Sequence, residues 1–306
     1  MGFDYNTTRF VLFSKKLGVD LSRPVTLGRQ SLFLHPKELS HILKAFGTSM
    51  TAEEESCIYE DGNLAEGLSP PADRLLEYLG ANSVDSIDAS GYEGATIIHD
   101  MNTPIPEVYH SRYSAIIDGG TLEHIFNLPV AVENCMKLLR PGGHMIGISP
   151  CNNFLGHGFY QFSPEFFFRL FSEENGFRTK IMVLTEVKSR GDWYEIPDPD
   201  MIRRRLVLQS QGESYLMLIA EKRGAEAGIH NTPQQSDYEN ALWEGQTLAA
   251  WNRRMAILNG IKKRVPVSFL NMAIPVRARL KSALARPFQD PSIRRIDPAH
   301  GLSRTK

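Results

Sequence analysis

The sequence has few cysteines and no long apolar run. Its three cysteines, Cys57, Cys135 and Cys151, are widely spaced and never form a CxxC pair. This scattered, odd-numbered set favours neither a disulfide framework nor a zinc knuckle. No segment reaches the ~18–20 uninterrupted apolar residues of a membrane span. The first twenty residues also lack the basic and apolar regions of a secretion signal. We therefore expect a cytoplasmic, globular protein.

Several motifs of well-known enzyme classes are missing as well. The chain contains no GxGxxG, no GxxxxGK[ST], no HExxH and no GxSxG. These absences argue against a dinucleotide-dependent dehydrogenase, a nucleotide hydrolase, a zinc protease and a serine hydrolase. The nine histidines form no cluster at metal-ligand spacing, so the sequence predicts no metal site.

Charge is unevenly distributed along the chain, although the net charge of the 306 residues is only −1. Residues 261–306 hold 11 Lys or Arg against two Asp, a balance of +9, whereas residues 1–260 hold 23 against 33, a balance of −10. The basic end, which also carries apolar segments, suits contact with a membrane surface or another anionic partner. A solvated basic tail is the alternative.

Strands and helices alternate from about residue 82 onward. Short apolar or β-branched runs predict strands over 83–88, 95–100, 113–118, 144–149, 179–187, 205–210 and 214–221, with an earlier first strand over 24–28. Amphipathic patterns predict helices over 36–46, 70–80, 238–258, after Asn127 and after Ser163. Asn127 is the predicted cap of its helix, which Pro141-Gly142-Gly143 follows. Strands of this kind bind ligands beyond their carboxyl ends, where the strand order reverses.

An ordered series of motifs lies between residues 113 and 150. It consists of a strand ending at Asp118, then Leu122-Glu123-His124-Ile125, a helix, and Leu139-Arg140-Pro141-Gly142-Gly143 before the next strand. This series resembles class I S-adenosylmethionine-dependent methyltransferases. The resemblance implies an α/β fold, with a Rossmann-like, seven-stranded, mostly parallel sheet and helices on both faces. We expect this domain over residues 1–223, followed by a linker and a basic C-terminal helical extension over 224–306.

The resemblance also implies a set of residues that bind S-adenosylmethionine. Asp88, at the end of the second strand, matches the carboxylate that accepts the ribose hydroxyls; the alternative is an Asp that initiates the turn before Ser90. Asp100 and Asn102 fall near the expected adenine amino group. Asp118 and Gly119 follow the next strand, at the same edge of the sheet.

The chain departs from the family at the first strand, where a GxGxG loop is usual. Here the strand ends in Leu27-Gly28-Arg29-Gln30. Because S-adenosylmethionine carries no phosphate, Gly28 alone allows close approach, with Arg29 facing the cofactor carboxylate and Gln30 as a polar contact. Loss of cofactor binding is the equally simple alternative.

Three residues are candidates for catalysis. Glu123 and His124 follow the fourth strand, and His157 lies in the aromatic loop after the fifth strand, with Asn152, Phe159, Tyr160 and Phe162. A base near neutral pKa removes the proton that an oxygen or nitrogen acceptor must lose. The alternatives are that His124 caps a turn and that the aromatic residues pack beneath the sheet.

These residues predict methyl transfer to a small-molecule or saccharide-like acceptor. A non-catalytic Rossmann-like binding or scaffolding module is the alternative. A nucleic-acid methyltransferase or binder is disfavoured because DGGT stands where amino-directed DNA enzymes carry (N/D)PP(Y/F).

Overall fold

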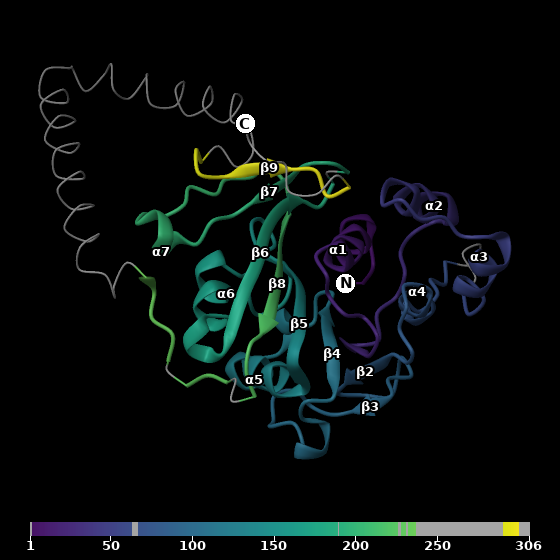
Figure 1. Cartoon of the computed structure of the whole chain (residues 1–306), viewed down its shortest axis with the longest axis horizontal. Coiled ribbons are helices and arrows are strands. Elements are labelled where there is room, and N and C mark those ends of the chain that lie inside the picture. Colours follow the sequence, from purple (N-terminus) through teal and green to yellow (C-terminus); the bar gives the residue numbers. More distant parts are fainter. Residues whose placement is uncertain are drawn as a thin grey trace, which may run out of the picture.

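The computed structural model describes residues 2–62, 67–188, 190–225, 228–230, 232–236 and 290–299. Within this part of the chain, nine strands form one sheet in the order β3-β2-β1-β4-β5-β8-β6-β7-β9 (Figure 1). The strands are β1 (Pro24–Leu27), β2 (Asp85–Asp88), β3 (Ile97–Ile98), β4 (Tyr113–Asp118), β5 (Leu139–Pro150), β6 (Phe177–Glu186), β7 (Trp193–Glu195), β8 (Ser214–Lys222) and β9 (Arg294–Ile296). The first five strands are mutually parallel, and only β7 and β8 run in the opposite direction. The predicted Rossmann-like, mostly parallel sheet is confirmed.

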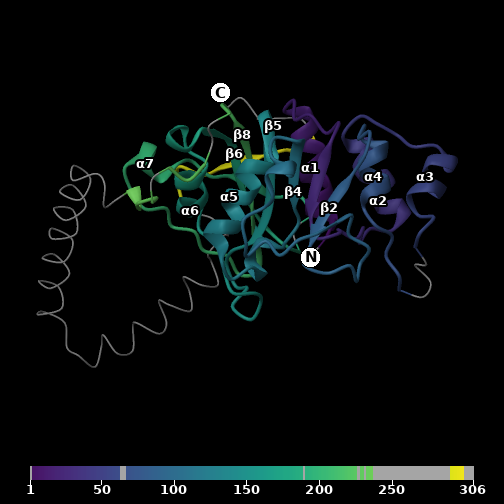
Figure 2. The same cartoon turned by 90° about the horizontal axis from the view of Figure 1, so that it is seen from below.

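Helices cover both faces of this sheet (Figure 2). The helices are α1 (Tyr5–Lys16), α2 (Pro36–Ala45), α3 (Ala52–Ile58), α4 (Asp73–Tyr78), α5 (Leu128–Leu138), α6 (Pro164–Leu170) and α7 (Pro199–Ile202). Side chains of β4 alternate between the two cores: Ile116 packs with residues of α5 and α6, whereas Ala115 and Ile117 pack with residues of α1 and α2. This alternation follows from the two-residue period of a strand.

The sheet has nine strands rather than the predicted seven, and one predicted strand is wrong. Residues 205–210 form no strand. Asn152 Nδ2 donates to the carbonyl of Leu208, and the side chain of Asn153 donates to Ser210. Side chains, rather than a neighbouring strand, therefore supply some of the hydrogen bonds that the backbone of this segment needs.

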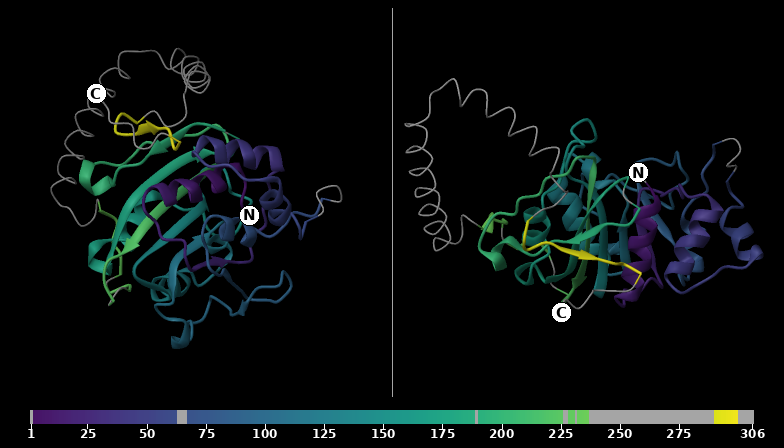
Figure 3. Two further views of the ribbon diagram at one scale, coloured as in Figure 1. Left: turned by 45° about the vertical axis from the view of Figure 1, so that its right-hand side comes forward. Right: turned by 90° about the horizontal axis from the view of Figure 1, so that it is seen from above.

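The two unpredicted strands, β7 and β9, pair with each other at one edge of the sheet (Figure 3). Asp290, which is buried, accepts hydrogen bonds from the Arg204 guanidinium and from the backbone N–H of Val207. The hydrogen bonds from Arg204 hold the pKa of Asp290 far below its usual range. Residues 294–296, which follow the predicted domain boundary at 223, thus add a strand to the sheet. The predicted helix over 238–258 lies outside the described residues.

Helix ends were predicted with mixed success. The Ser163 hydroxyl accepts from the N–H of Phe166, so the predicted cap of α6 is confirmed. Asn127 precedes α5, but its side chain makes no cap hydrogen bond and donates instead to the carbonyl of Asn102. Helix α1, which is capped by the side chain of Asp4, was not predicted from the sequence. None of the helices in the described residues is both long and apolar enough to cross a membrane.

Candidate functional site

The carboxyl ends of β1, β2 and β4 meet at one edge of the sheet. The central strand β1 has β2 on one side and β4 on the other, so the strand order reverses at β1. An open α/β sheet has its ligand crevice at this point. Gly28, Asp88 and Asp118 stand at these three strand ends.

Gly28 allows the three loops to approach each other closely. Its φ of +66° lies in the left-handed region, which side-chain-bearing residues rarely adopt. A Cβ atom at this position would lie 3.3 Å from Thr121 Oγ1 and 3.7 Å from Asp88 Oδ2. The Thr121 hydroxyl in turn donates to the carbonyl of Leu27 at 2.7 Å. Gly28 therefore stands beside the predicted ribose-binding carboxylate.

Gln30 is packed between the loops after β1 and β4. Its side chain donates from Nε2 to the carbonyl of Leu27, and the residue is only 3% exposed. Its Oε1 atom is buried and has no hydrogen-bond partner in the described part of the chain. A Cβ atom on Gly119 would come within 2.4 Å of this oxygen. Gln30 and Gly119 thus fill the crevice between the loops, and Gln30 does not face solvent in this conformation.

Arg29 is already paired within the protein. Its Nε donates to Asp73 Oδ2 at 3.0 Å, and its Nη1 donates to the carbonyl of Glu93 at 3.2 Å. Burial raises the pKa of Asp73, and the hydrogen bond from Arg29 opposes that shift. Arg29, Gln30 and Glu93 line a hollow of about 440 Å³ beside the β1 loop. The carboxylate that Arg29 faces here is that of Asp73.

Asp88 both closes a turn and faces Gly28. Its Oδ1 accepts from the N–H of Ser90 at 2.8 Å, as in the turn-initiating alternative. Its Oδ2 is the oxygen that lies near Gly28. The carboxylate therefore keeps one oxygen on the side of the crevice.

Asp100 and Asn102 connect the β3 loop to the start of α5. Asp100 Oδ1 accepts from both the backbone N–H and the side-chain amide of Asn102, and these bonds lower the pKa of Asp100. Asn102 Oδ1 accepts from the N–H of Asn127 at 2.8 Å. Both ends of the Asn102 amide are thus engaged in holding the loop.

Asp118 lies entirely inside the loop that follows β4. It is 0% exposed, and its Oδ1 accepts from the N–H groups of Gly120 and Thr121. Burial raises its pKa to about 6, against the opposing effect of those hydrogen bonds. Asp118 therefore shapes the loop that carries Glu123 toward the same edge.

The three predicted catalytic residues lie together. Glu123 Oε1 is 3.6 Å from His157 Nε2 and 3.9 Å from His124 Nε2, and the two imidazole rings meet edge to face with centroids 4.8 Å apart. Glu123 is 0% exposed, whereas the histidine side chains are partly exposed. Burial, followed by the nearby Asp118 carboxylate, raises the pKa of Glu123 to about 8. Burial, followed by His157, lowers the pKa of His124. The cluster therefore combines a carboxyl group that resists ionisation with a neutral imidazole.

The aromatic residues of the loop around His157 differ in their burial and contacts. Phe162 is buried against Phe166 and Phe167 of α6, so it packs beneath the sheet. Phe159 is 66% exposed and meets Phe126 edge to face. The hydroxyl of Tyr160 donates to the carbonyl of Phe126 at 2.7 Å. The outer aromatic residues thus border the turn that carries Glu123.

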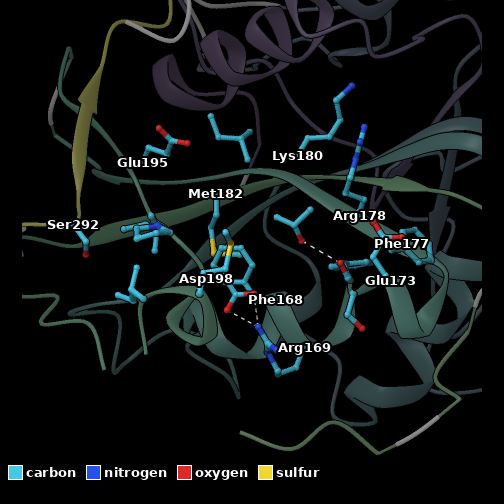
Figure 4. Close-up of a pocket in the computed structure, with 18 of the residues that line it drawn as sticks. Phe168, Arg169, Glu173, Phe177, Arg178, Lys180, Met182, Glu195, Asp198 and Ser292 are labelled. Carbon is cyan, nitrogen blue, oxygen red and sulfur yellow. Dashed lines mark hydrogen bonds and ion pairs between the residues drawn. The ribbon is translucent and has the colours of Figure 1, made fainter. Parts of the chain in front are cut away.

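A separate groove of about 760 Å³ surrounds the first half of β6 (Figure 4). Arg169 and Asp198 lie side by side in it as an ion pair, and the side chains of Arg178 and Lys180 extend from β6. None of the predicted site residues lines this groove. The polar residues at the carboxyl edge therefore remain the candidate site.

Comparison with known proteins gives structural matches only. No family model matches the sequence, and neither does any curated protein. Among solved structures, the chain is similar to the 1,6-didemethyltoxoflavin-N1-methyltransferase of Burkholderia thailandensis, solved with bound 1,6-didemethyltoxoflavin and S-adenosylhomocysteine. That match has 13% identity and a TM-score of 0.35, and it covers 71% of this chain and 77% of the other. The N-methyltransferase NodS of Bradyrhizobium japonicum matches with 10% identity and a TM-score of 0.38, covering 72% and 95%. The branched-chain polyamine synthase of Thermus thermophilus matches with 12% identity and a TM-score of 0.34, covering 75% and 60%. Methyltransferases recur among these matches, and the order of the strands defines the Rossmann-like fold independently of them.

Two residues that shape the site were not among the predicted site residues. Thr121 bonds the β4 loop to β1, and Gly158 brings the loop of His157 against Glu123. A Cβ on Gly158 would lie 2.8 Å from the backbone oxygen of Glu123, and the φ of Gly158 is +70°. The Gly-His-Gly stretch at 156–158 was the available signal, because a glycine beside a candidate histidine indicates a close backbone approach.

Proposed function

We propose that the chain transfers a methyl group from S-adenosylmethionine to a small-molecule or saccharide-like acceptor. The convergence of Glu123, His124 and His157 beside the crevice of a Rossmann-like sheet is the observation that carries this proposal. Two loops that are far apart in the sequence bring their acid and base groups to one point, next to the strand ends that hold a ligand in such sheets.

The residues at the crevice fit the cofactor in part. Gly28 lets the loops after β1, β2 and β4 approach each other closely, and one oxygen of Asp88 lies beside it as an acceptor for ribose hydroxyls. When bound, S-adenosylmethionine supplies a methyl group on a cationic sulfonium. Gly28 and Asp88 are thus the residues that would hold the cofactor, with Gln30 and Gly119 forming the wall between them and β4.

The cluster of Glu123, His124 and His157 is suited to removing a proton from the acceptor. The lowered pKa of His124 keeps its imidazole neutral, so a ring nitrogen is free to accept a proton. A positioned base of this kind typically contributes a factor of about 10²–10⁴ to the rate. The exposed aromatic rings of Phe126 and Phe159 offer an apolar surface next to it.

The test is calorimetric titration of S-adenosylmethionine and S-adenosylhomocysteine into the full chain and two matched variants. Asp88→Asn keeps an oxygen for the Ser90 turn and removes the charge that faces Gly28. We expect it to weaken binding by about tenfold or more, the loss of one charged hydrogen-bond acceptor. Asp85→Asn makes the same change at the other end of β2, where Asp85 accepts from the Tyr113 hydroxyl, and should bind like the unmodified chain. Equal affinity of all three proteins would contradict the assignment of Asp88.

A non-catalytic Rossmann-like module is the second candidate. The observation that favours it is that Gln30 fills the crevice and Arg29 is paired with Asp73, so neither is aimed at a ligand. Under this alternative, neither ligand binds the unmodified chain at millimolar concentration, and Gln30→Ala does not restore binding.

We also propose that the basic segment 261–306 contacts an anionic partner. Its charge balance of +9 supports this proposal. Binding to acidic vesicles or polyanions that weakens with salt and disappears when the Lys and Arg residues within 262–286 are replaced by Gln, with Asp290 and β9 left in place, would support it. Equal binding by this variant would contradict it.

A further inference from the structure

Glu123, His124 and His157 present three metal-ligating atoms to one point. One ligand atom from each residue lies within 4.8 Å of the other two. Glu123 Oε1 is the closest to both imidazoles, at 3.6 Å from His157 Nε2 and 3.9 Å from His124 Nε2. Donors bound to one tetrahedral zinc ion at about 2.0–2.2 Å lie about 3.4 Å apart. Shifts of a few tenths of an ångström bring the carboxylate into range of each imidazole. The two histidine side chains are partly exposed, so their ligand atoms can move closer to each other.

The buried atoms of this cluster have no other partner. Both carboxylate oxygens of Glu123 and the Nε2 atom of His157 are buried without a hydrogen bond from any described residue. A buried carboxyl group in this state costs free energy unless something pairs with it. Three unpartnered polar atoms facing one another are what a shared cation would satisfy.

We propose that Glu123, His124 and His157 bind one divalent first-row transition metal ion. One carboxylate and two imidazoles suit zinc and iron(II), whereas magnesium and calcium prefer sites made only of oxygen atoms. The adjacent positions of Glu123 and His124 and the separation of His157 by more than thirty residues hide this set from a search for sequence motifs.

The surrounding loops hold the ligands in place. The backbone oxygen of Glu123 accepts from the N–H of Phe159 at 2.7 Å, which fastens the His157 loop to the Glu123 turn. The ring of Phe154 contacts His157 and also stacks on Tyr215. These contacts limit the movement that the three ligands need to reach a metal ion.

Three protein ligands leave a coordination position open to water or to a small ligand. The histidine side chains are 37% and 47% exposed, so the open position is on the solvent side of the buried carboxylate. A metal ion there lowers the pKa of a bound hydroxyl group. Metal binding goes beyond the proposed methyl transfer and does not depend on it, and His124 would act as a base only in the metal-free chain.

The test uses the full chain, without a polyhistidine tag and freed of metal by a chelator. Zinc is titrated by calorimetry, and cobalt(II) by its visible absorption, which reports coordination geometry. We expect one equivalent to bind. Glu123→Gln and His157→Ala should each weaken binding at least tenfold, and magnesium should not compete. His41→Ala, which removes an exposed histidine from α2, is the matched control and should leave the affinity unchanged.

The variants also guard against a trivial loss of folding. Glu123→Gln removes a buried group that resists ionisation, so this protein should fold at least as well as the unmodified chain, as circular dichroism will verify. A correctly folded Glu123→Gln protein with unchanged metal affinity would overturn the proposal, and so would an unmodified chain that binds no metal. Binding of S-adenosylmethionine is measured separately on the same samples, so that failure of either proposal is recognised by itself.

Discussion

The two halves of the carboxyl edge differ in how their polar groups are satisfied. At the ends of β1, β2 and β3, Arg29 pairs with Asp73, Asp88 bonds to Ser90, and Asn102 bonds to the start of α5. At the ends of β4 and β5, Glu123 and His157 have buried polar atoms without hydrogen-bond partners among the described residues. Apart from the buried Gln30 Oε1, the first half therefore has internal partners that stabilise the loops, whereas the second keeps a buried carboxyl group with no partner on either oxygen.

This difference bears on the roles that we propose for the two halves. Internal pairing lowers the cost of burying polar groups, so it needs no ligand to explain it. Buried groups with raised pKa values and no partner are retained at a cost, and such groups concentrate at functional sites. Under the proposed function, the loops after β1, β2 and β3 would bind the cofactor by rearranging existing contacts, whereas Glu123, His124 and His157 already lie together.

The largest expected effect comes from Glu123→Gln in the presence of a chelator. The pKa of Glu123 is about 8 in the folded chain, above the value of about 4.3 expected when unfolded. The folded state therefore holds the proton longer, and stability should fall as pH rises between these two values, by at most about 1.4 kcal/mol per pH unit. Glutamine does not ionise, so the variant should not lose stability in this way. The unfolding free energy of Glu123→Gln relative to the unmodified chain should therefore rise by up to about 4 kcal/mol from pH 5 to pH 8. Urea unfolding across this range measures it.

Glu133→Gln is the control for this experiment. Glu133 lies on α5, partly exposed and paired with Lys137, and its replacement should leave the pH dependence unchanged. If the unmodified chain and Glu123→Gln lose stability in parallel, the carboxyl group of Glu123 is not the source of the pH dependence.

Gly158→Ala should have the next largest effect. Its φ of +70° is strained for alanine, and the added Cβ would lie 2.8 Å from the Glu123 backbone oxygen. These two costs together are about 2–4 kcal/mol of folding free energy. Gly156→Ala, in the same loop with nothing near its Cβ, should be tolerated. Equal melting temperatures for the two variants would show that the loop does not pack on Glu123.

Much of the fold could be predicted because its strands carry the expected patterns. Seven predicted ranges became strands, since a buried parallel strand such as Tyr113–Asp118 reads as a continuous apolar run. The segment 205–210 contains a short apolar run, as a strand does. However, the side chains of Asn152 and Asn153 form hydrogen bonds with part of its backbone. The pairing of β7 with β9 joins residues about a hundred positions apart and leaves no local signal.

The site was predictable residue by residue but not as a cluster. Glu123 and His157 could each be named because they follow strands of the predicted sheet. Their contact depends on Gly158 meeting the Glu123 backbone, a long-range approach that periodicity does not encode. Likewise, the sequence places Gln30 at the crevice but does not show that its side chain turns inward against Gly119.

Gly119→Ala tests whether the crevice between β1 and β4 is filled as tightly as the structure indicates. The added Cβ would meet Gln30 Oε1 at 2.4 Å, and we expect a loss of about 1–2 kcal/mol of stability. Shortening the opposing side chain with Gln30→Ala should relieve this clash, so the double variant should be more stable than the two single effects predict. Strictly additive effects in urea unfolding would mean that the two residues do not touch.

Asn102→Ala should give the smallest effect and separates support from ligand binding in the internally paired half. The substitution removes the hydrogen bond from the Asn127 N–H, so we expect about 1 kcal/mol of lost stability. Asn82→Ala, at an exposed position, should change stability by less than about 0.5 kcal/mol. Because both ends of the Asn102 amide are engaged in the loop, the affinity for S-adenosylmethionine should stay within about twofold of the unmodified chain, a difference of about 0.4 kcal/mol. A large loss of affinity with unchanged stability would instead assign Asn102 to the adenine, and the β3 loop would then belong with the ligand-binding groups.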